Sequence, residues 1–141
     1  MPLITDTGFA PDDDLTLIGL DALPGAGEGT ALDLPLDSDI ETIAAHFDRL
    51  DLIVVAFPNF GDGRGFSLAK RLRALGYRGR LRAAGHVIPD QYAFARFCGF
   101  DEVQISAEQA ERQPEGQWKT ETRALPPFLR RRVAGWTRAT A

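Results

Sequence analysis

The stretch from residue 58 to 66 holds the residue types best suited to chemistry. Three glycines alternate with an acid and a base, and glycine lets a backbone turn tightly and approach a ligand closely. A predicted helix follows, and the start of a helix attracts anions through unpaired N–H groups and its dipole. Arg64 can add a two-pronged grip on a carboxylate, phosphate or sulfur oxyanion. We therefore predict a ligand-binding loop made by Asn59, Gly61, Asp62, Gly63, Arg64 and Gly65.

The same loop has a plainer interpretation, in which Asp62 and Arg64 only bond the local backbone of a structural turn. Two nucleotide-binding motifs are excluded. A dinucleotide fingerprint needs glycine at position 66 and an acidic residue at position 86, where this chain has Phe66 and His86. A P-loop needs a Gly-Lys-Ser/Thr ending, which is missing here. We do not expect nucleic-acid binding either, because a solvated helix face explains most bases between residues 64 and 82.

A second polar stretch follows the next predicted strand and is expected beside the glycine loop. His86 can shuttle protons or contact an oxyanion, although such a histidine is more often an ordinary loop residue. The candidate catalytic residues are His86, Asp62 and Asp90, while Gln91 and Arg82 are candidate ligand-binding residues. Cys98 is expected to be a packed thiol rather than a reactive one.

These residues are positioned by a predicted α/β fold of one domain, with a mostly parallel sheet and alternating strands and helices. An open three-layer sheet and a half-barrel-like sheet both stay open. Strands are expected at 15–20, 32–36, 52–57, 80–85 and 102–105, with 32–36 at an edge because of Pro35. Helices are expected at 38–50, 66–75, 89–99 and 106–114, with the side chains of Tyr92, Phe94, Phe97 and Cys98 buried. Parallel strands gather their carboxyl ends at one edge, where ligands usually bind.

The two ends of the chain carry weaker patterns. Residues 1–14, with Pro11 and three consecutive aspartates, are predicted to be a flexible acidic lead-in. Residues 114–141 are predicted to be an irregular basic tail that packs on the body of the protein or on a partner.

Composition limits the classes of protein that remain. With 141 residues, 44% of them hydrophobic, the chain can bury the core of a single domain. No membrane-spanning run and no signal-peptide core are found, so a cytoplasmic location is expected. One cysteine with two histidines cannot hold a structural zinc or a cysteine-ligated cluster, so no metal site and no covalently held cofactor are expected.

Charge is distributed unevenly along the chain. Residues 1–51 carry twelve acids against one base, whereas residues 52–141 carry fifteen bases against eight acids. The attraction between the halves is satisfied inside one molecule or between two subunits of a homodimer, or it leaves a basic face free to meet a small anion or an acidic partner.

Three blocks of residues resemble the bacterial family called domain of unknown function 934, over roughly residues 30–105. They are Phe57-Pro58-x-Phe60-x-Asp62-Gly63-Arg64-Gly65-x-Ser67, Leu81-Arg82-Ala83-x-Gly85-x-Val87-x-Pro89-Asp90-Gln91, and Arg96-x-Cys98-Gly99-Phe100-Asp101. Members are commonly labelled as oxidoreductases of sulfite reduction, because they accompany assimilatory sulfite reductase and phosphoadenylylsulfate reductase. The resemblance therefore implies a pathway rather than a reaction, and at position 86 this chain has histidine where the family often has aspartate.

Three functions follow as hypotheses. The leading one is an accessory protein of sulfite reduction that docks on a sulfite reductase component and assists electron transfer or positions a cofactor. The second is a small enzyme or sensor that binds an anionic sulfur or phosphate compound at Gly61–Gly65. The third is a structural interaction subunit without chemistry of its own, so whether the chain is an enzyme stays open.

Overall fold

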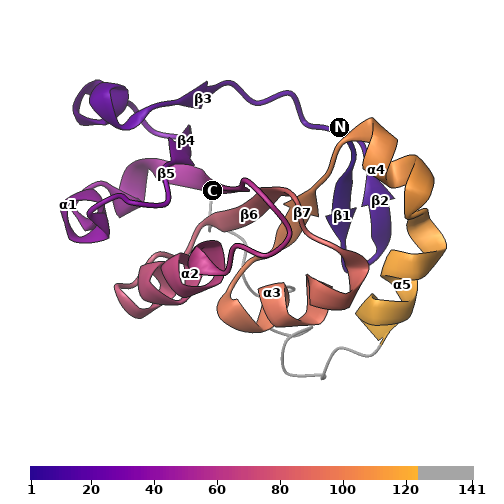
Figure 1. Cartoon of the computed structure of the whole chain (residues 1–141). Coiled ribbons are helices and arrows are strands. Elements are labelled where there is room, and N and C mark those ends of the chain that lie inside the picture. Colours follow the sequence, from indigo (N-terminus) through magenta and orange to yellow (C-terminus); the bar gives the residue numbers. More distant parts are fainter. Residues whose placement is uncertain (124–141) are drawn as a thin grey trace.

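A seven-stranded sheet forms the centre of the computed structural model, which describes residues 1–123 (Figure 1). The strands are β1 (Leu3–Thr5), β2 (Gly8–Ala10), β3 (Leu17–Ile18), β4 (Thr30–Leu34), β5 (Leu50–Phe57), β6 (Arg80–Gly85) and β7 (Glu102–Gln104). Their order across the sheet is β2-β1-β7-β6-β5-β4-β3. The strands from β3 to β7 are parallel, and β1 is antiparallel to both of its neighbours. The predicted α/β fold with a mostly parallel sheet is confirmed.

The helices between the parallel strands lie together on one face of the sheet, and the last two helices lie beside the hairpin of β1 and β2 (Figure 1). The helices are α1 (Ile40–Ala44), α2 (Arg64–Ala74), α3 (Tyr92–Cys98), α4 (Ala107–Arg112) and α5 (Glu115–Arg123), and 3-10 turns lie at Leu20–Gly25, Phe47–Arg49 and Pro89–Gln91. Because β4 to β7 are consecutive neighbours, right-handed crossovers place α1, α2 and α3 on the same face. These three helices therefore form one layer on this face of the sheet. None of the helices in the described part of the chain has the length and apolar composition that crossing a membrane requires.

Strand β5 is the centre of the core, as its continuous apolar sequence predicts. Ile53, Val55 and Phe57 belong to the large cluster on the helical face, while Leu52 and Val54 are buried on the opposite face. Burying each of these side chains contributes about 1.5–3 kcal/mol, which accounts for the apolar residues at the buried positions 52–55 and 57.

The prediction of a flexible lead-in over residues 1–14 is wrong for its first ten residues. β1 and β2 form a hairpin, and β1 also pairs with β7. In the hairpin turn, Asp6 accepts hydrogen bonds from the Tyr92 hydroxyl at 2.6 Å and from Arg96 Nε at 3.0 Å. These contacts hold the hairpin in place. Its partners lie about a hundred residues away in the sequence, so no local pattern reveals them.

Several predicted elements differ from the structure in their bounds, their place in the sheet or their type; the strand expected over 15–20, for example, is reduced to β3 at Leu17–Ile18. The helix expected over 38–50 ends at Ala44, because Leu50 starts β5, and its cap is Asp39, whose side chain accepts from the N–H of Glu41. The strand expected over 32–36 is not an edge strand, since β3 pairs with β4 outside it. The tail expected to be irregular from 114 forms helix α5, which buries Trp118. Residues 124–141 of that predicted tail lie outside the described residues.

Helix α3 begins after Pro89 and ends at Gly99, as predicted, with Gly99 at a φ of 119°. Tyr92 and Cys98 are buried, but Phe94 and Phe97 are 49% and 58% exposed. The prediction that all four side chains are buried is therefore wrong for the two phenylalanines. At about 3.6 residues per turn, both lie on the side of the helix opposite Tyr92.

Candidate functional site

The turn before α2 is held by bonds between its own residues. Asp62 Oδ1 accepts from the N–H and the Nε of Arg64, both at 3.0 Å, and Asp62 Oδ2 lies 2.7 Å from Arg64 Nη2. Asn59 Oδ1 accepts from the N–H of Gly61 at 3.0 Å. The hydrogen bonds from the Arg64 side chain and backbone lower the pKa of Asp62 from 3.8 to about 2. Arg64 is thus already engaged by a carboxylate, as in the structural-turn interpretation.

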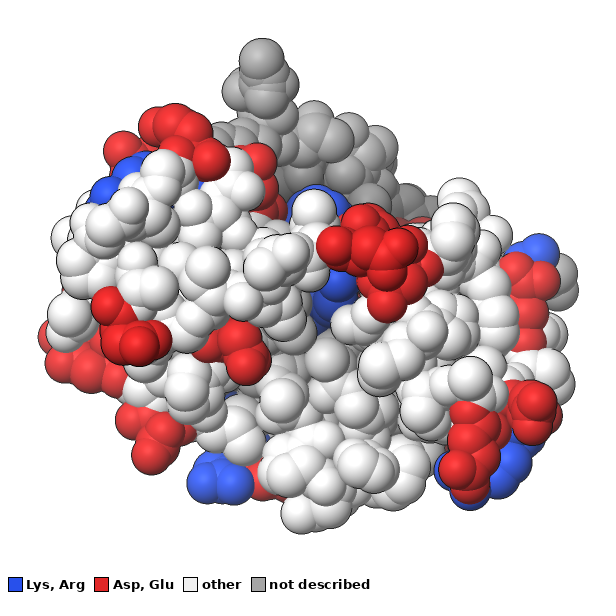
Figure 2. Space-filling model, turned by 90° about the horizontal axis from the view of Figure 1, so that it is seen from above, with Lys and Arg blue, Asp and Glu red and all other residues white. Residues whose placement is uncertain are grey.

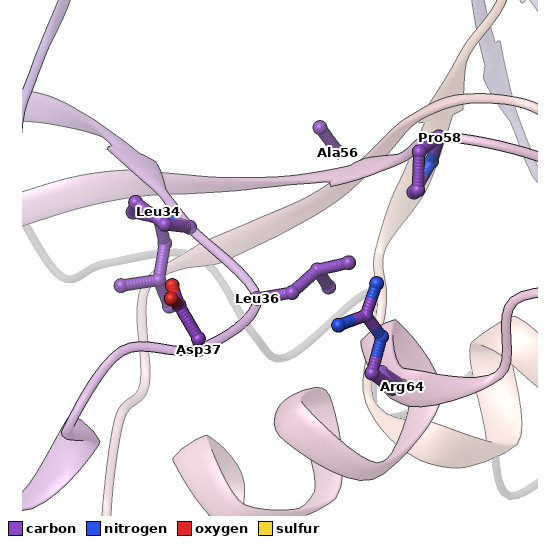
Figure 3. Close-up of a pocket in the computed structure, with 7 residues that line it drawn as sticks. Leu34, Leu36, Asp37, Ala56, Pro58 and Arg64 are labelled. Atoms are coloured by element: carbon purple, nitrogen blue, oxygen red, sulfur yellow. The ribbon is translucent and has the colours of Figure 1, made fainter.

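A cleft of about 350 Å³ opens on the β4 side of this turn (Figure 3). Its lining residues are Leu34, Pro35, Leu36, Asp37, Ala56, Pro58 and Arg64. Figure 3 shows the Arg64 guanidinium directed toward the gap between Leu36 and Pro58. The walls are mostly apolar. The lining contains one acid, Asp37, and one base, Arg64, and Arg64 is itself paired with Asp62, so the cleft has no excess of bases.

On its β6 side, the turn contacts the stretch that follows β6. His86 Nδ1 is 3.0 Å from the carbonyl oxygen of Phe57, and the rings of His86 and Phe60 meet at right angles with centroids 4.9 Å apart. Gln91 Nε2 donates to the carbonyl oxygen of Phe60 at 3.3 Å. The structure therefore brings His86 and Gln91 beside the loop, as the parallel-sheet rule predicts. Asp90 is exposed in the 3-10 turn Pro89–Gln91.

Arg82 is not part of this neighbourhood. It is 3% exposed and shares the face of the sheet with Val54 and Ala84, opposite the face that the helices cover. Its Nε lies 2.6 Å from Glu102 Oε2, and its Nη2 lies 2.7 Å from Asp13 Oδ2. The prediction that Arg82 and Arg64 share a ligand is thus not supported by their positions. Asp13 and Asp6 also show that part of the acidic half pairs with the basic half inside one molecule.

The most exposed large apolar side chains of this region are not among the predicted site residues. Phe60, Phe94 and Phe97 are 41%, 49% and 58% exposed, and we call them the aromatic surface. The carbonyl group of Phe60 accepts a hydrogen bond from the side chain of Gln91, the residue before α3. Phe94 and Phe97 follow Gln91 at intervals of three residues. The sequence does contain a signal for two of them. At about 3.6 residues per turn, Phe94 and Phe97 lie on the side of the helix opposite Tyr92, so a buried Tyr92 predicts that both are exposed.

The aromatic surface is anchored to the core and bordered by basic residues of α2. The Phe94 ring contacts the buried Phe66 ring, with centroids 4.9 Å apart, and Lys70 Nζ lies 5.5 Å from the centre of the Phe94 ring. Lys70 and Arg71 are exposed, and α2 contains no acidic residue. Cys98, on the same helix, is buried, and burial raises the pKa of its thiol. This favours the packed role predicted for it.

Together, these features define a one-domain α/β protein whose mostly parallel sheet carries a glycine-rich turn and a cleft at the carboxyl ends of its strands, with the aromatic surface on that turn and on α3. Residues 31–126 match the family described as a bacterial protein of unknown function, DUF934. The match spans more than two thirds of the sequence, so the chain belongs to this family. Comparisons with curated proteins and with solved structures gave no match.

Proposed function

We propose that this protein is an accessory component of assimilatory sulfite reduction that docks on a sulfite reductase component. The pathway comes from the resemblance of the glycine loop and its two downstream blocks to proteins labelled in this way. The docking role is supported by one observation above all, the exposed Phe94 and Phe97 beside the basic side of α2. Assistance to electron transfer is the second part of the proposal.

The aromatic surface has the properties of a binding hot spot. A single exposed aromatic residue is common on protein surfaces, but aromatic residues are enriched in the buried centres of interfaces. The contact of Phe94 with Phe66 holds its ring in place before a partner arrives, so little side-chain freedom remains to be lost on binding. The adjoining exposed phenylalanine, Phe97, extends the contact area along α3.

Charge suggests the chemistry of the partner surface. Lys70 borders the aromatic surface at the Phe94 ring. Acidic side chains are spread over the side of the molecule that carries β3, β4 and α1, while acidic and basic side chains mix at the opposite end (Figure 2). A partner with an apolar patch and an acidic rim is attracted to the basic side and repelled by the acidic side. Binding should therefore weaken as salt rises, since added ions screen exposed charges.

The anion-binding alternative has less support in the geometry. It relies on Arg64 and Arg82, yet Asp62 engages the first and a buried ion-pair cluster engages the second. A small anion would have to displace a carboxylate in either place. The aromatic surface needs no such rearrangement before it binds.

The proposal is tested by calorimetry with the purified sulfite reductase hemoprotein at low ionic strength. We expect the wild-type protein to bind and the double variant Phe94→Ala/Phe97→Ala to bind at least about tenfold more weakly, because hot-spot truncation typically costs 2 kcal/mol or more. Leu17→Ala is the matched control, since Leu17 is 39% exposed on the far edge strand β3. The Leu17→Ala midpoint in urea should match the wild type, whereas the double variant loses the Phe94–Phe66 ring contact and should have a slightly lower midpoint, so binding is compared under conditions where all three proteins are folded.

Two results would contradict the proposal. One is the absence of binding at low ionic strength. The other is equal binding by the double variant and the Leu17→Ala control. If the complex forms, the rate of sulfite reduction with and without this protein then tests the part of the proposal that concerns electron transfer.

A further inference from the structure

The face of the sheet opposite α1, α2 and α3 is buried over β4 and β5. Paired residues of parallel strands point to the same side, so Ala31, Leu52 and Val54 share this face with Arg80 and Arg82. The three apolar residues, which we call the covered patch, are only 6%, 0% and 3% exposed. A sheet face is shielded from water to this extent only when a second layer packs on it.

One part of that layer belongs to the acidic segment before β3. Asp13 Oδ2 accepts from Nη2 of Arg80 at 2.9 Å and from Nη2 of Arg82 at 2.7 Å, both on β6. Asp12 Oδ2 accepts from Nε2 of Gln104 on β7 at 3.1 Å. The segment therefore lies over the polar side chains of β6 and β7, next to the covered patch.

The covered patch itself has no apolar second layer among residues 1–123. In this part of the chain its apolar neighbour on the same face is Ala84, which lies on β6 within the sheet. The helices between the parallel strands pack on the other face, and α5 packs beside β2 and α3 (Figure 1). Because the patch is buried in a single molecule, its cover comes from the same chain.

Residues 124–141 have the composition that such a cover needs. They contain five large apolar side chains and four arginines but no acid. These residues are Leu125, Phe128, Leu129, Val133 and Trp136, with Arg130, Arg131, Arg132 and Arg138. The apolar groups suit the covered patch, and an arginine suits Asp33, which is exposed beside Val54 on the same face.

The length of this segment is sufficient to reach the patch. Helix α5 ends at Arg123 and packs beside β2, and four strand spacings, about 19 Å in all, separate β2 from β5. Eighteen extended residues span up to about 60 Å, so residues 124–141 can pass round the edge of the sheet and reach β5.

We propose that residues 124–141 bind the covered patch of their own molecule and pair an arginine with Asp33. The cover stops short of the carboxyl ends of the strands, because Ala56, the next residue on this face of β5, is exposed. This inference goes beyond the docking function and does not depend on it, since Phe94 and Phe97 lie on α3, on the other side of the sheet.

Thiol labelling of the full-length chain tests the proposal. Val54→Cys places a thiol under the cover, and Ala56→Cys places the matched control beyond it on the same strand, while native Cys98 is buried and gives a slow background. We expect Val54→Cys to react at least tenfold more slowly than Ala56→Cys with a disulfide reagent. Adding Phe128→Ser/Trp136→Ser should raise the Val54→Cys rate at least tenfold and leave the Ala56→Cys rate unchanged.

A nitroxide attached to Ala56→Cys gives a second measurement that needs no substitution in residues 124–141. It should broaden the NMR signals of that segment within the tagged molecule. Broadening only in a mixture of tagged protein with untagged, isotope-labelled protein would assign the cover to a second copy and overturn the proposal, as would no broadening at all. Val54→Cys labelling as fast as Ala56→Cys, or slow labelling that the Phe128→Ser/Trp136→Ser change does not accelerate, would also overturn it.

Discussion

Replacing Gly65 with alanine should destabilise the fold, although alanine is ordinarily the better helix residue. Gly65 lies in the first turn of α2, directly over the Phe57 ring. The new methyl group would come within 2.7 and 2.9 Å of ring carbons, whereas ordinary contacts begin at 3.4 Å. The ring cannot easily withdraw, because it is 3% exposed and packs against Phe66 and Phe100.

The magnitude follows from two opposing terms. Overpacking a core of this kind typically costs about 1–3 kcal/mol, and alanine in place of glycine returns up to about 1 kcal/mol in a helix. The net loss should be about 1–2 kcal/mol in the free energy of unfolding. Equilibrium unfolding in urea measures it as a lower midpoint at an unchanged slope.

Gly63→Ala is the control for this prediction, because its methyl group meets nothing within 4 Å. We expect that variant to be unchanged or more stable by up to about 1 kcal/mol. In a Phe57→Leu background, where the ring is absent, the cost of Gly65→Ala should shrink. A Gly65→Ala protein as stable as Gly63→Ala would refute the reasoning.

Three further predictions concern charged and polar groups. Because the folded-state pKa of Asp62 is lowered from 3.8 to about 2, the stabilisation from this carboxylate is present above about pH 4 and lost as pH falls toward 2. A titration midpoint near 3.8 for the Asp62 carboxyl group, measured by NMR, would contradict this. Arg82→Leu leaves buried Glu102 with one arginine partner instead of two, so the free energy of unfolding measured in urea should fall by about 3 kcal/mol. A fall of less than about 1 kcal/mol would show that the ion-pair cluster does not depend on Arg82. Tyr92→Phe removes the donor to Asp6 and should cost about 1–2 kcal/mol, whereas a wild-type urea midpoint would mean that this bond contributes nothing.

The parts of the fold that could be predicted are those with a strong local pattern. The apolar run of β5, the amphipathic α2 with its glycine end, and the strand Arg80–Gly85 appear where the sequence indicates them. The contact between the glycine loop and the His86–Gln91 stretch was also predictable, because parallel strands end at the same edge.

The parts that could not be predicted depend on distant residues. β1 pairs with β7, and Arg82 pairs with Glu102 and Asp13, twenty and sixty-nine positions away. Alternation along a strand does place residues 80 and 82 on one face, but the sequence does not show which partners cover that face. The exposure of Phe97 likewise depends on how α3 lies on the sheet.

Hydrogen–deuterium exchange of this protein, measured with and without the sulfite reductase hemoprotein at low ionic strength, tests the docking proposal most directly. We predict slower exchange in the peptides covering residues 57–66 and 92–100, and unchanged exchange at 15–20 around β3. Protection at 15–20 with none in the other two peptides would place the interface elsewhere and contradict the proposal.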